Sequence, residues 1–271
     1  MHIRKVFIGA KFGQARKEVD PEGLCQLEYL EFPGLSRHRQ LAHGVFTRHG
    51  GVSESPYDAL NASYSTGDQP DCVGINLQII EEAIGAEHLV FMNQVHGKGV
   101  LALSKGDSQD LGTAAQVDAI ITDMPRVALM VKQADCQAVI LFDPAKGVVS
   151  NVHCGWRGNT HNILGLVVSQ MRKGFGCRES DVMAAIGPSL GPCCGEFMTH
   201  EQIFPNEFRQ FMVRENYFDL WRISRWQLLN AGLIEENIEV AGICTRCRTD
   251  MFYSYRAEGI TGRFATVAML K

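Results

Sequence analysis

Two reactive residues stand near opposite ends of one segment, ADCQAVILFDPAKGVVSNVHCGWRG at positions 134–158. Two strand-like apolar runs separate Cys136 from His153, and DPAKG between them is typical of a turn, since Pro suits its second position and Gly its exit. If Phe142 pairs with Gly147 around a four-residue loop, Cys136 lies directly opposite His153. Their Cβ atoms would then be about 5 Å apart on one face of a sheet.

A thiol and an imidazole at that separation support two kinds of chemistry. They can share a metal ion, at about 2.3 Å for sulfur and about 2.0 Å for nitrogen on zinc, or form a thiolate nucleophile with a general base. Alternatively, Cys136 is a small buried hydrophobe and His153 a hydrogen-bonded strand-end residue, because free cysteine is commonly buried. All three interpretations stay open at this point. Side chains alternate along a strand, so Asp135 is expected on the opposite face and outside the catalytic set.

His96 is a third candidate ligand. It lies in NQVHG at 93–97, near the expected end of a strand, and Gly97 directly after it allows a sharp turn that exposes the imidazole.

The composition is that of an ordinary globular protein. The chain has 271 residues, of which 45% are hydrophobic, enough for a substantial core. Lys and Arg total 26 against 30 Asp and Glu, and no basic run suits a phosphate backbone, so nucleic acid is not an expected partner. No apolar run approaches the ~20 residues of a membrane span or forms a signal-peptide core, which favours a cytoplasmic protein without membrane contact. Nine cysteines, an odd number, favour reduced thiols.

The pattern along the chain predicts mixed helices and strands without a linker. We therefore expect one domain over residues 1–271, with 1–40 as a less certain, strand-forming or irregular lead-in. Helical spacing of apolar residues, or a cap, predicts helices over 72–86, 159–173 (from Asn159 to Gly174), 199–213 and 219–232. Apolar runs predict strands that include 117–123, 127–143 (one bent strand or two) and 147–156. This mixture is typical of an α/β or α+β sandwich.

Several motifs, in order from about residue 42 to the C-terminus, resemble the YfiH family, also called polyphenol oxidase or laccase-domain-containing proteins. The motifs are TRHGGVSESPYDALN (47–61), NQVHG (93–97), QADCQAVILFD (133–143), HCGWRG (153–158), IGPSLGPCC (186–194), DLW…QLLNAG (219–232) and FYSYRAEGITGR (252–263).

The resemblance implies an α+β fold, a layered α/β/β/α sandwich with mixed sheets. It also implies a mononuclear Zn2+ site, or Cu2+ in its place, made by His96, Cys136 and His153. Three protein ligands with one open position are typical of catalytic zinc. The implied activity is purine nucleoside phosphorylase toward adenosine, inosine and S-methyl-5'-thioadenosine, with adenosine deaminase beside it. Nucleoside and phosphate are then the partners, and the protein would be a monomer or a homodimer.

Phosphorolysis needs a group that holds phosphate, and a guanidinium can meet two of its oxygens at once. Arg48 in TRHGG is the main candidate, because two glycines beside it let backbone N–H groups approach an anion. Arg157, four residues after His153, is the second. Asn93 is a candidate for orienting the substrate. For deamination, the metal would lower the pKa of a water toward about 7, so that it attacks C6 of adenine.

Two cysteine motifs allow a further interpretation. CTRC at 244–247 and the adjacent Cys193 and Cys194 could form a second metal site. One CxxC is a weak signal and adjacent cysteines point apart on a strand, so we interpret them as structural thiols.

A copper-dependent, laccase-like polyphenol oxidase is an alternative function. A four-copper centre uses many histidines, typically in His-x-His pairs, and this chain has nine histidines and no such pair. Copper in the Cys/His site would explain such oxidation better. A metal-free Cys136/His153 hydrolase and a peptidoglycan-precursor editing role, attached to bacterial members of the family, are two further candidate functions.

Overall fold

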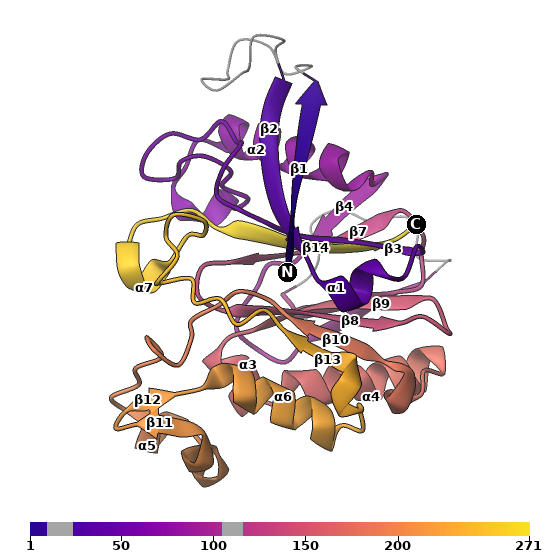
Figure 1. Cartoon of the computed structure of the whole chain (residues 1–271), viewed down its shortest axis with the longest axis vertical. Helices are drawn as coiled ribbons and strands as arrows, with labels where there is room; N and C mark the ends of the chain where they lie inside the picture. Colours follow the sequence, from indigo (N-terminus) through magenta and orange to yellow (C-terminus); the bar gives the residue numbers. More distant parts are fainter. Residues whose placement is uncertain (10–23, 105–115) are drawn as a thin grey trace.

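Two six-stranded sheets lie face to face in the computed structural model, which describes residues 1–9, 24–104 and 116–271. The first sheet has the order β1 (His2–Gly9), β2 (Leu24–Glu31), β3 (Leu41–Phe46), β14 (Phe264–Leu270), β7 (Val127–Gln133), β4 (His88–Phe91). The second has the order β13 (Ile238–Val240), β10 (Met183–Ile186), β8 (Gln137–Asp143), β9 (Val148–Cys154), β6 (Ala119–Thr122), β5 (Val100–Leu103). Figure 1 shows β14, the last strand, lying between strands from the first half of the chain.

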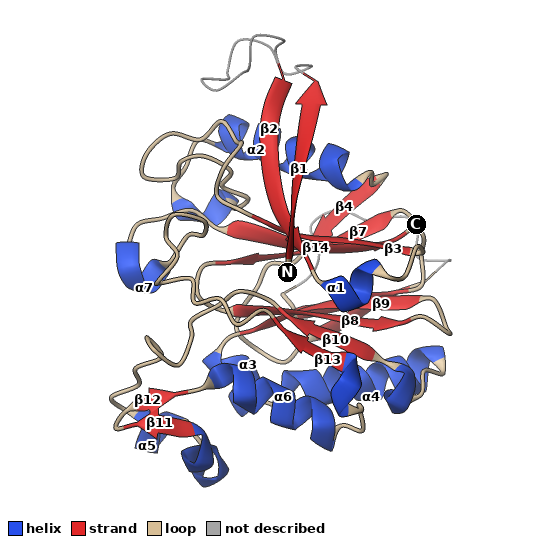
Figure 2. Ribbon diagram, viewed as in Figure 1, coloured by secondary structure: helices blue, strands red, loops and turns tan. Residues whose placement is uncertain are grey.

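Both sheets are mixed. The pairs β4 with β7, β5 with β6 and β10 with β13 are parallel, and the other pairs among the described strands of these two sheets are antiparallel. Helix α2 (Pro70–Ile84) covers the first sheet, and α3 (Trp156–Thr160), α4 (Ile163–Phe175) and α6 (Leu220–Asn230) cover the second (Figure 2). The short elements are α1 (Pro33–Ser36), α5 (His200–Ile203), α7 (Tyr255–Glu258) and the hairpin of β11 (Met212–Arg214) with β12 (Tyr217–Phe218). The expected α+β fold with α/β/β/α layers is confirmed.

The largest core cluster lies between the two sheets and receives buried side chains from both. Leu129 and Val131 of β7 meet Ile140 and Phe142 of β8 in this cluster. The alternate residues of the same strands face the helices, as Met130 does toward α2. Strands buried on both faces explain why the run 127–143 is almost continuously apolar.

That run forms two strands in different sheets, because the chain crosses between the sheets at residues 134–136. The expected register of the following hairpin was wrong by two positions: Asp143 pairs with Val148, which places Ala138 opposite His153. Asp143 fixes the turn, since its Oδ1 atom accepts the backbone N–H groups of Ala145 and Lys146 at 2.8 and 2.9 Å. The shift is even, so Cys136 and His153 keep the same side.

Two expected helices differ from those observed. The segment 159–173 holds the end of α3 and most of α4. Helix α4 is capped by Asn162, whose side chain accepts the N–H of Gly165, while Asn159 is buried. The helix ends at Gly176, which adopts a left-handed φ of 69°, and not at Gly174. Residues 199–213 form α5, a 3-10 turn over 206–211 and β11, because their phenylalanines pack into a separate aromatic cluster.

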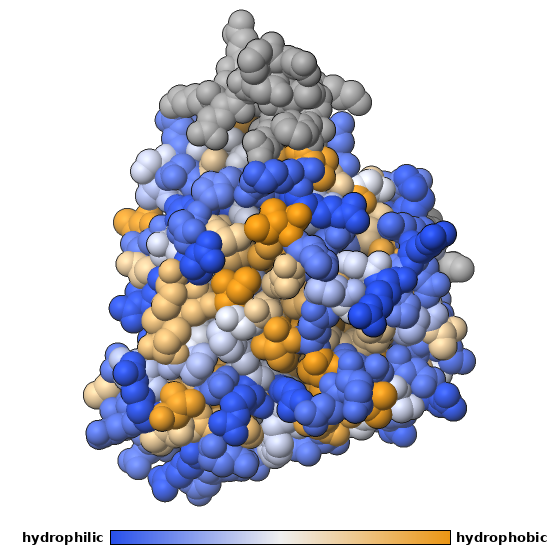
Figure 3. Space-filling model, viewed as in Figure 1, coloured by the Kyte–Doolittle hydropathy of each residue, from blue (hydrophilic) through white to orange (hydrophobic). Residues whose placement is uncertain are grey.

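The lead-in contributes β1, β2 and α1, and its residues 10–23 lie outside the described residues. That one domain spans 1–271 stays a prediction. On the face drawn in Figure 3, hydrophobic side chains lie in small groups among hydrophilic ones. None of the described helices has both the length and the apolar character that a membrane crossing requires.

Candidate metal centre and active site

His96, Cys136 and His153 converge at one point, although they come from three segments. His96 lies in the loop after β4, Cys136 directly precedes β8, and His153 lies in β9. Their ligand atoms all lie within 4.8 Å of one another. The Cys136 Sγ atom is 3.8 Å from Nε2 of His96, and the two imidazole rings are 4.8 Å apart between centroids. The structure therefore brings together all three expected ligands.

These atoms fit a metal ion. Tetrahedral zinc with bonds of about 2.3 Å to sulfur and about 2.0 Å to nitrogen holds the two ligand atoms about 3.5 Å apart. The observed separation of 3.8 Å between Cys136 Sγ and His96 Nε2 is close to that value. One thiolate with two imidazoles is a donor set that suits zinc and also copper.

Asp118, which immediately precedes β6 and is fully buried, orients both histidines. Its Oδ1 atom lies 2.8 Å from Nδ1 of His153 and accepts the backbone N–H of His96 at 2.9 Å. Its Oδ2 atom accepts the backbone N–H of Gly97 at 2.7 Å. Because Nδ1 of His153 is engaged, Nε2 is the atom left to face the cluster, an arrangement common behind metal-bound histidines.

Asp118 also holds His96 in an unusual backbone conformation. His96 has φ of 58°, in the left-handed region that residues other than glycine rarely adopt. The sharp turn expected at Gly97 therefore begins one residue earlier. Sequence reasoning missed Asp118; the available signal was a carboxylate before an otherwise apolar strand.

The electrostatics of the cluster favour a thiolate. Burial alone would raise the pKa of Cys136, but the charge and hydrogen bond of His153, together with His96, lower it to about 6. Burial alone would lower the pKa of His153, but Cys136 and Asp118 raise it to about 9. Burial also opposes ionisation of Asp118, and hydrogen bonds from His153, Gly97 and His96 outweigh it, so that pKa is lowered. A thiolate is the form of cysteine that binds metal.

Gly155 makes room for the Cys136 thiol. A Cβ atom at this glycine would lie 2.7 Å from Cys136 Sγ and 3.6 Å from Cδ2 of His96. That first distance is shorter than van der Waals contact, so a side chain here would displace the sulfur. The glycine of HCGWRG therefore has a steric role at the site.

A cavity of about 530 Å3 opens onto the cluster, and all three candidate ligands line it. Three cationic side chains also line it, namely Lys132, Arg256 and Arg263. Its aromatic lining residues are Trp156, Phe197 and Tyr255. Asn93 lies in the lining as well. The cavity thus combines flat aromatic surfaces with positive charge, which suits a ligand with an aromatic ring together with an anion such as phosphate.

Two of the cations, Arg256 and Arg263, are held in place by backbone carbonyl groups. Arg263 donates to the carbonyl oxygens of Thr261 and Gly262 at 2.9 and 2.8 Å. Arg256 donates from its guanidinium to the carbonyl of Glu196 at 3.0 Å. Burial lowers the pKa of Lys132 to about 8. Sequence reasoning did not single out these residues, although FYSYRAEGITGR contains both arginines and Lys132 stands alone in a buried strand.

Asp135 holds the cavity wall. Its carboxylate accepts hydrogen bonds from the hydroxyls of Thr245 and Ser254, each at 2.7 Å, and from the backbone N–H of Arg256 at 2.6 Å. Asp135 itself has φ of 87°. These bonds fix the chain where it crosses between the sheets, directly before Cys136.

The structure places Arg48 and Arg157 outside the lining of this cavity. Arg48 is mostly buried, bonds Glu258 at 2.8 Å and the Thr249 carbonyl at 2.9 Å, and lies over the ring of Tyr253. Arg157 stacks on Trp156, at 4.3 Å from the ring centroid. In the structure the Arg48 guanidinium anchors the segment 249–258. A direct contact of Arg48 with phosphate stays a prediction.

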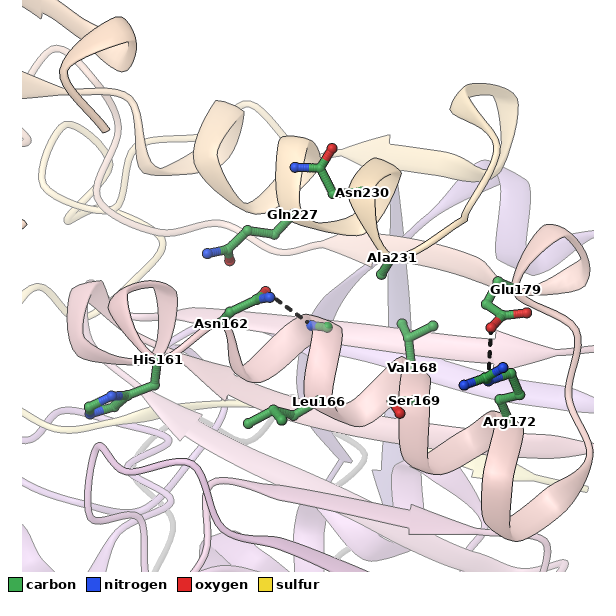
Figure 4. A pocket seen from close by; sticks show the side chains of 11 residues that line it. His161, Asn162, Leu166, Val168, Ser169, Arg172, Glu179, Gln227, Asn230 and Ala231 are labelled. Atoms are coloured by element: carbon green, nitrogen blue, oxygen red, sulfur yellow. Dashed lines mark hydrogen bonds and ion pairs between the residues drawn. The ribbon is translucent and has the colours of Figure 1, made fainter. Parts of the chain in front are cut away.

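A second cavity, of about 390 Å3, lies between α4 and α6 in the outer helical layer (Figure 4). Arg172 and Glu179 form an ion pair of 3.1 Å in its wall, and Asn162 caps α4 there. Its lining includes no cysteine and one histidine, His161, so it does not assemble a metal site.

Residues 42–271 match the family described as multi-copper polyphenol oxidoreductase laccase. The purine nucleoside phosphorylase of Bacteroides thetaiotaomicron is 32% identical over 260 residues, which cover 89% of this chain and 96% of the relative. The purine nucleoside phosphorylase YlmD of Geobacillus stearothermophilus is 33% identical over 239 residues, covering 81% and 86%.

Solved structures give the same picture. The hypothetical protein YfiH of Bacillus licheniformis superposes with a TM-score of 0.81 at 27% identity, covering 90% of this chain and 96% of that one. YlmD of Geobacillus stearothermophilus has the same TM-score and coverage at 29% identity. Similarity in sequence and in fold thus extends over most of the chain.

Proposed function

The chain belongs to the YfiH family, described as multi-copper polyphenol oxidoreductase laccase, and on that premise we propose that it is a metal-dependent purine nucleoside phosphorylase. One observation carries the proposal: His96, Cys136 and His153 converge in a cavity that also holds three cationic side chains. The proposed substrates are adenosine, inosine and S-methyl-5'-thioadenosine with inorganic phosphate. The names of the relatives support a phosphorylase.

The lining residues suggest how substrates bind. A purine base stacks favourably on aromatic rings, and Trp156, Phe197 and Tyr255 offer them. Phosphate is bound by Arg256, Arg263 and Lys132, since charge-assisted hydrogen bonds to phosphate are short and strong. Arg48 then acts indirectly, by anchoring the segment that carries Arg256. Asn93 orients the nucleoside.

Phosphorolysis requires that a phosphate oxygen form a bond to C1' of the ribose while the glycosidic bond breaks. The electron pair of that bond leaves with the purine, which takes up a proton. Zinc held by His96, Cys136 and His153 would supply a Lewis-acidic centre with one open position. Asp118 keeps His153 in one tautomer, and the cations of the lining hold the phosphate against the sugar.

We also propose adenosine deamination at this site. There a water oxygen replaces the amino group at C6 of adenine, which leaves as ammonia, and inosine is the product. Zinc is the proposed ion. Copper can occupy a Cys/His site tightly, which would explain polyphenol oxidation without a dedicated copper centre.

A four-copper centre finds little support in the structure. Within residues 1–9, 24–104 and 116–271, the groups of converging ligands are the His96, Cys136, His153 cluster and a cluster of four cysteines. Two histidines are too few for such a centre.

A metal-free Cys136/His153 hydrolase is the second candidate, and the paired pKa shifts of these two residues favour it. Peptidoglycan-precursor editing stays a prediction from the family resemblance. Metal content and substrate choice distinguish the three functions.

The test is to incubate protein purified without added metal with adenosine, with and without phosphate, and to measure adenine, ribose 1-phosphate and inosine. We expect adenine only with phosphate and inosine in both cases. Cys136→Ala should lose the metal ion of the His96, Cys136, His153 site and all three products, whereas the control Cys72→Ala, at the start of α2, should keep them. A muramyl-peptide precursor serves as the competing substrate. Full turnover after complete removal of metal would contradict the proposal and favour the metal-free hydrolase.

A further inference from the structure

Four cysteines converge in a second cluster, apart from the cavity ligands. Cys193 and Cys194 lie in the loop after β10, and Cys244 and Cys247 lie in the loop after β13. Their Sγ atoms all lie within 4.8 Å of one another. The two loops therefore bring four thiols together from positions about fifty residues apart.

The separations match a shared ion. Cys247 Sγ lies 3.7 Å from Cys193 Sγ and 3.6 Å from Cys194 Sγ. Tetrahedral zinc with bonds of about 2.3 Å holds any two sulfur ligands about 3.8 Å apart. A disulfide would place two sulfur atoms about 2.05 Å apart. Cys247 Sγ instead lies at nearly the same, longer distance from two other sulfur atoms, as ligands of one ion do.

The turn at residues 191–194 explains how adjacent cysteines can face the same way. The backbone N–H of Cys194 donates to the carbonyl of Gly191 at 2.9 Å, which closes a turn. On a strand, Cys193 and Cys194 would point to opposite faces, as the sequence interpretation assumed. In the turn they converge on the CTRC loop, so the assumption that the two adjacent thiols point apart does not hold.

The cluster also has the surroundings of bound thiolates. The backbone N–H of Gly191 donates to Cys244 Sγ at 3.3 Å, and such bonds reduce the charge on a thiolate. Cys194 and Cys244 are buried beside Leu190 and Trp221, whereas Cys193 and Cys247 are exposed. An ion can thus reach the site from solvent while its inner side is dry.

We propose that Cys193, Cys194, Cys244 and Cys247 bind a structural zinc ion through four thiolates. The four thiols release their protons to solvent as the ion binds. Four sulfur ligands leave no open position, so this site does no chemistry on a substrate. It is independent of the function proposed above.

The ion would fasten two loops that form a wall of the substrate cavity. The first loop carries Leu190, which lines the cavity, and the second carries Thr245, which bonds Asp135. The loops already meet through backbone hydrogen bonds of 3.1 and 3.0 Å that join Ser189 to Ile243 and Thr245. Four metal–sulfur bonds would add a cross-link that survives local opening.

Metal analysis of the whole protein, purified in reductant without added metal, tests the proposal. We expect two zinc ions per chain in the wild type and one in the double variant Cys193→Ser, Cys247→Ser, whose targets are exposed. Cys136→Ala should also retain one, which distinguishes the two sites. The matched control Cys72→Ser should retain two, and Cys247→His should retain two because three cysteines and one histidine also bind zinc.

A second measurement needs no variant. Wild-type protein loaded with cobalt should show the thiolate charge-transfer and visible bands of tetrahedral sulfur coordination, and a mercurial should release one equivalent only after four thiols have reacted. The proposal fails if the wild type holds one zinc that Cys136→Ala removes, if the double variant keeps both ions, if iron takes this place, or if freshly purified protein carries a disulfide within the cluster.

Discussion

Asp118 Oδ1 lies 2.8 Å from Nδ1 of His153, and this contact links the start of β6 to the neighbouring strand β9. The same carboxylate accepts three backbone N–H groups from the loop of His96, those of Val95, His96 and Gly97. One buried aspartate thus sets the tautomer of one candidate ligand and the position of another. Its effect on the metal centre should therefore exceed that of any single hydrogen bond.

Asp118→Asn should weaken zinc binding at the His96, Cys136, His153 site by about 10- to 100-fold, the usual effect of losing a partner behind a metal ligand. The amide cannot accept all the bonds that the carboxylate accepts, and its NH2 group would face donors. Competition with a chelator of known affinity measures the change. Asp71→Asn, on the exposed start of α2, is the control and should change affinity less than twofold. Equal affinity in the two variants would refute the role of Asp118.

Gly155→Ala should displace the Cys136 thiol, because the added Cβ would lie 2.7 Å from Sγ. We expect a loss of zinc affinity of about tenfold or more, as for other disruptions of ligand geometry. The far-UV circular dichroism should remain that of the wild type. Gly174→Ala is the control, since a Cβ there meets nothing within 4 Å and alanine favours the helix. If Gly155→Ala bound zinc with wild-type affinity, the proposed steric role of Gly155 beside the Cys136 sulfur would be wrong.

Arg256→Ala should raise the KM for phosphate by roughly 10- to 100-fold, corresponding to the loss of a charged hydrogen bond of about 1.5–3 kcal/mol. The main-chain bond from residue 256 to Asp135 is retained in this variant. Arg157 stacks on Trp156 but does not itself line the cavity, so Arg157→Ala should have only a small effect on the KM for phosphate. Steady-state kinetics with varied phosphate compares the two. If Arg157→Ala raised the KM for phosphate more than Arg256→Ala does, Arg157 and not Arg256 would be the main phosphate-binding residue.

Phosphate binding should weaken as pH rises through about 8, where burial places the pKa of Lys132. Lysine is charged below its pKa, so its attraction for phosphate is complete at lower pH and is lost as the amine becomes neutral. The KM for phosphate, measured between about pH 7 and pH 10, should therefore rise at the alkaline end.

Lys132→Arg provides the matched comparison, because a guanidinium stays charged throughout that range. Its KM profile should be flat where that of the wild type rises. An identical alkaline rise in both proteins would assign the titration to another group.

Most elements were predictable because their signals are local. The apolar spacing and Gly85 predict α2, and the structure ends this helix with Gly85 at φ of 74°. The turn DPAKG predicts the β8–β9 hairpin. Alternation along the strands correctly placed Cys136 and His153 on one side. The predicted register was wrong by two positions, because Asp143 pairs with Val148 and the loop therefore consists of residues 144–147.

The apolar runs of the sequence by themselves predicted a mixed α/β or α+β sandwich, and the turn DPAKG placed Cys136 near His153. The resemblance of its motifs to the YfiH family implied the α/β/β/α layers and added His96 to the ligand set. Tertiary structure decided what joins distant segments: that Asp118 stands behind His153, that Arg48 binds Glu258 while Arg256 lines the cavity, and that Cys193 and Cys194 meet Cys244 and Cys247. The physical reason is that strand order and loop paths set these contacts, and both depend on how the whole chain buries its apolar surface. Periodicity along one segment carries no information about them.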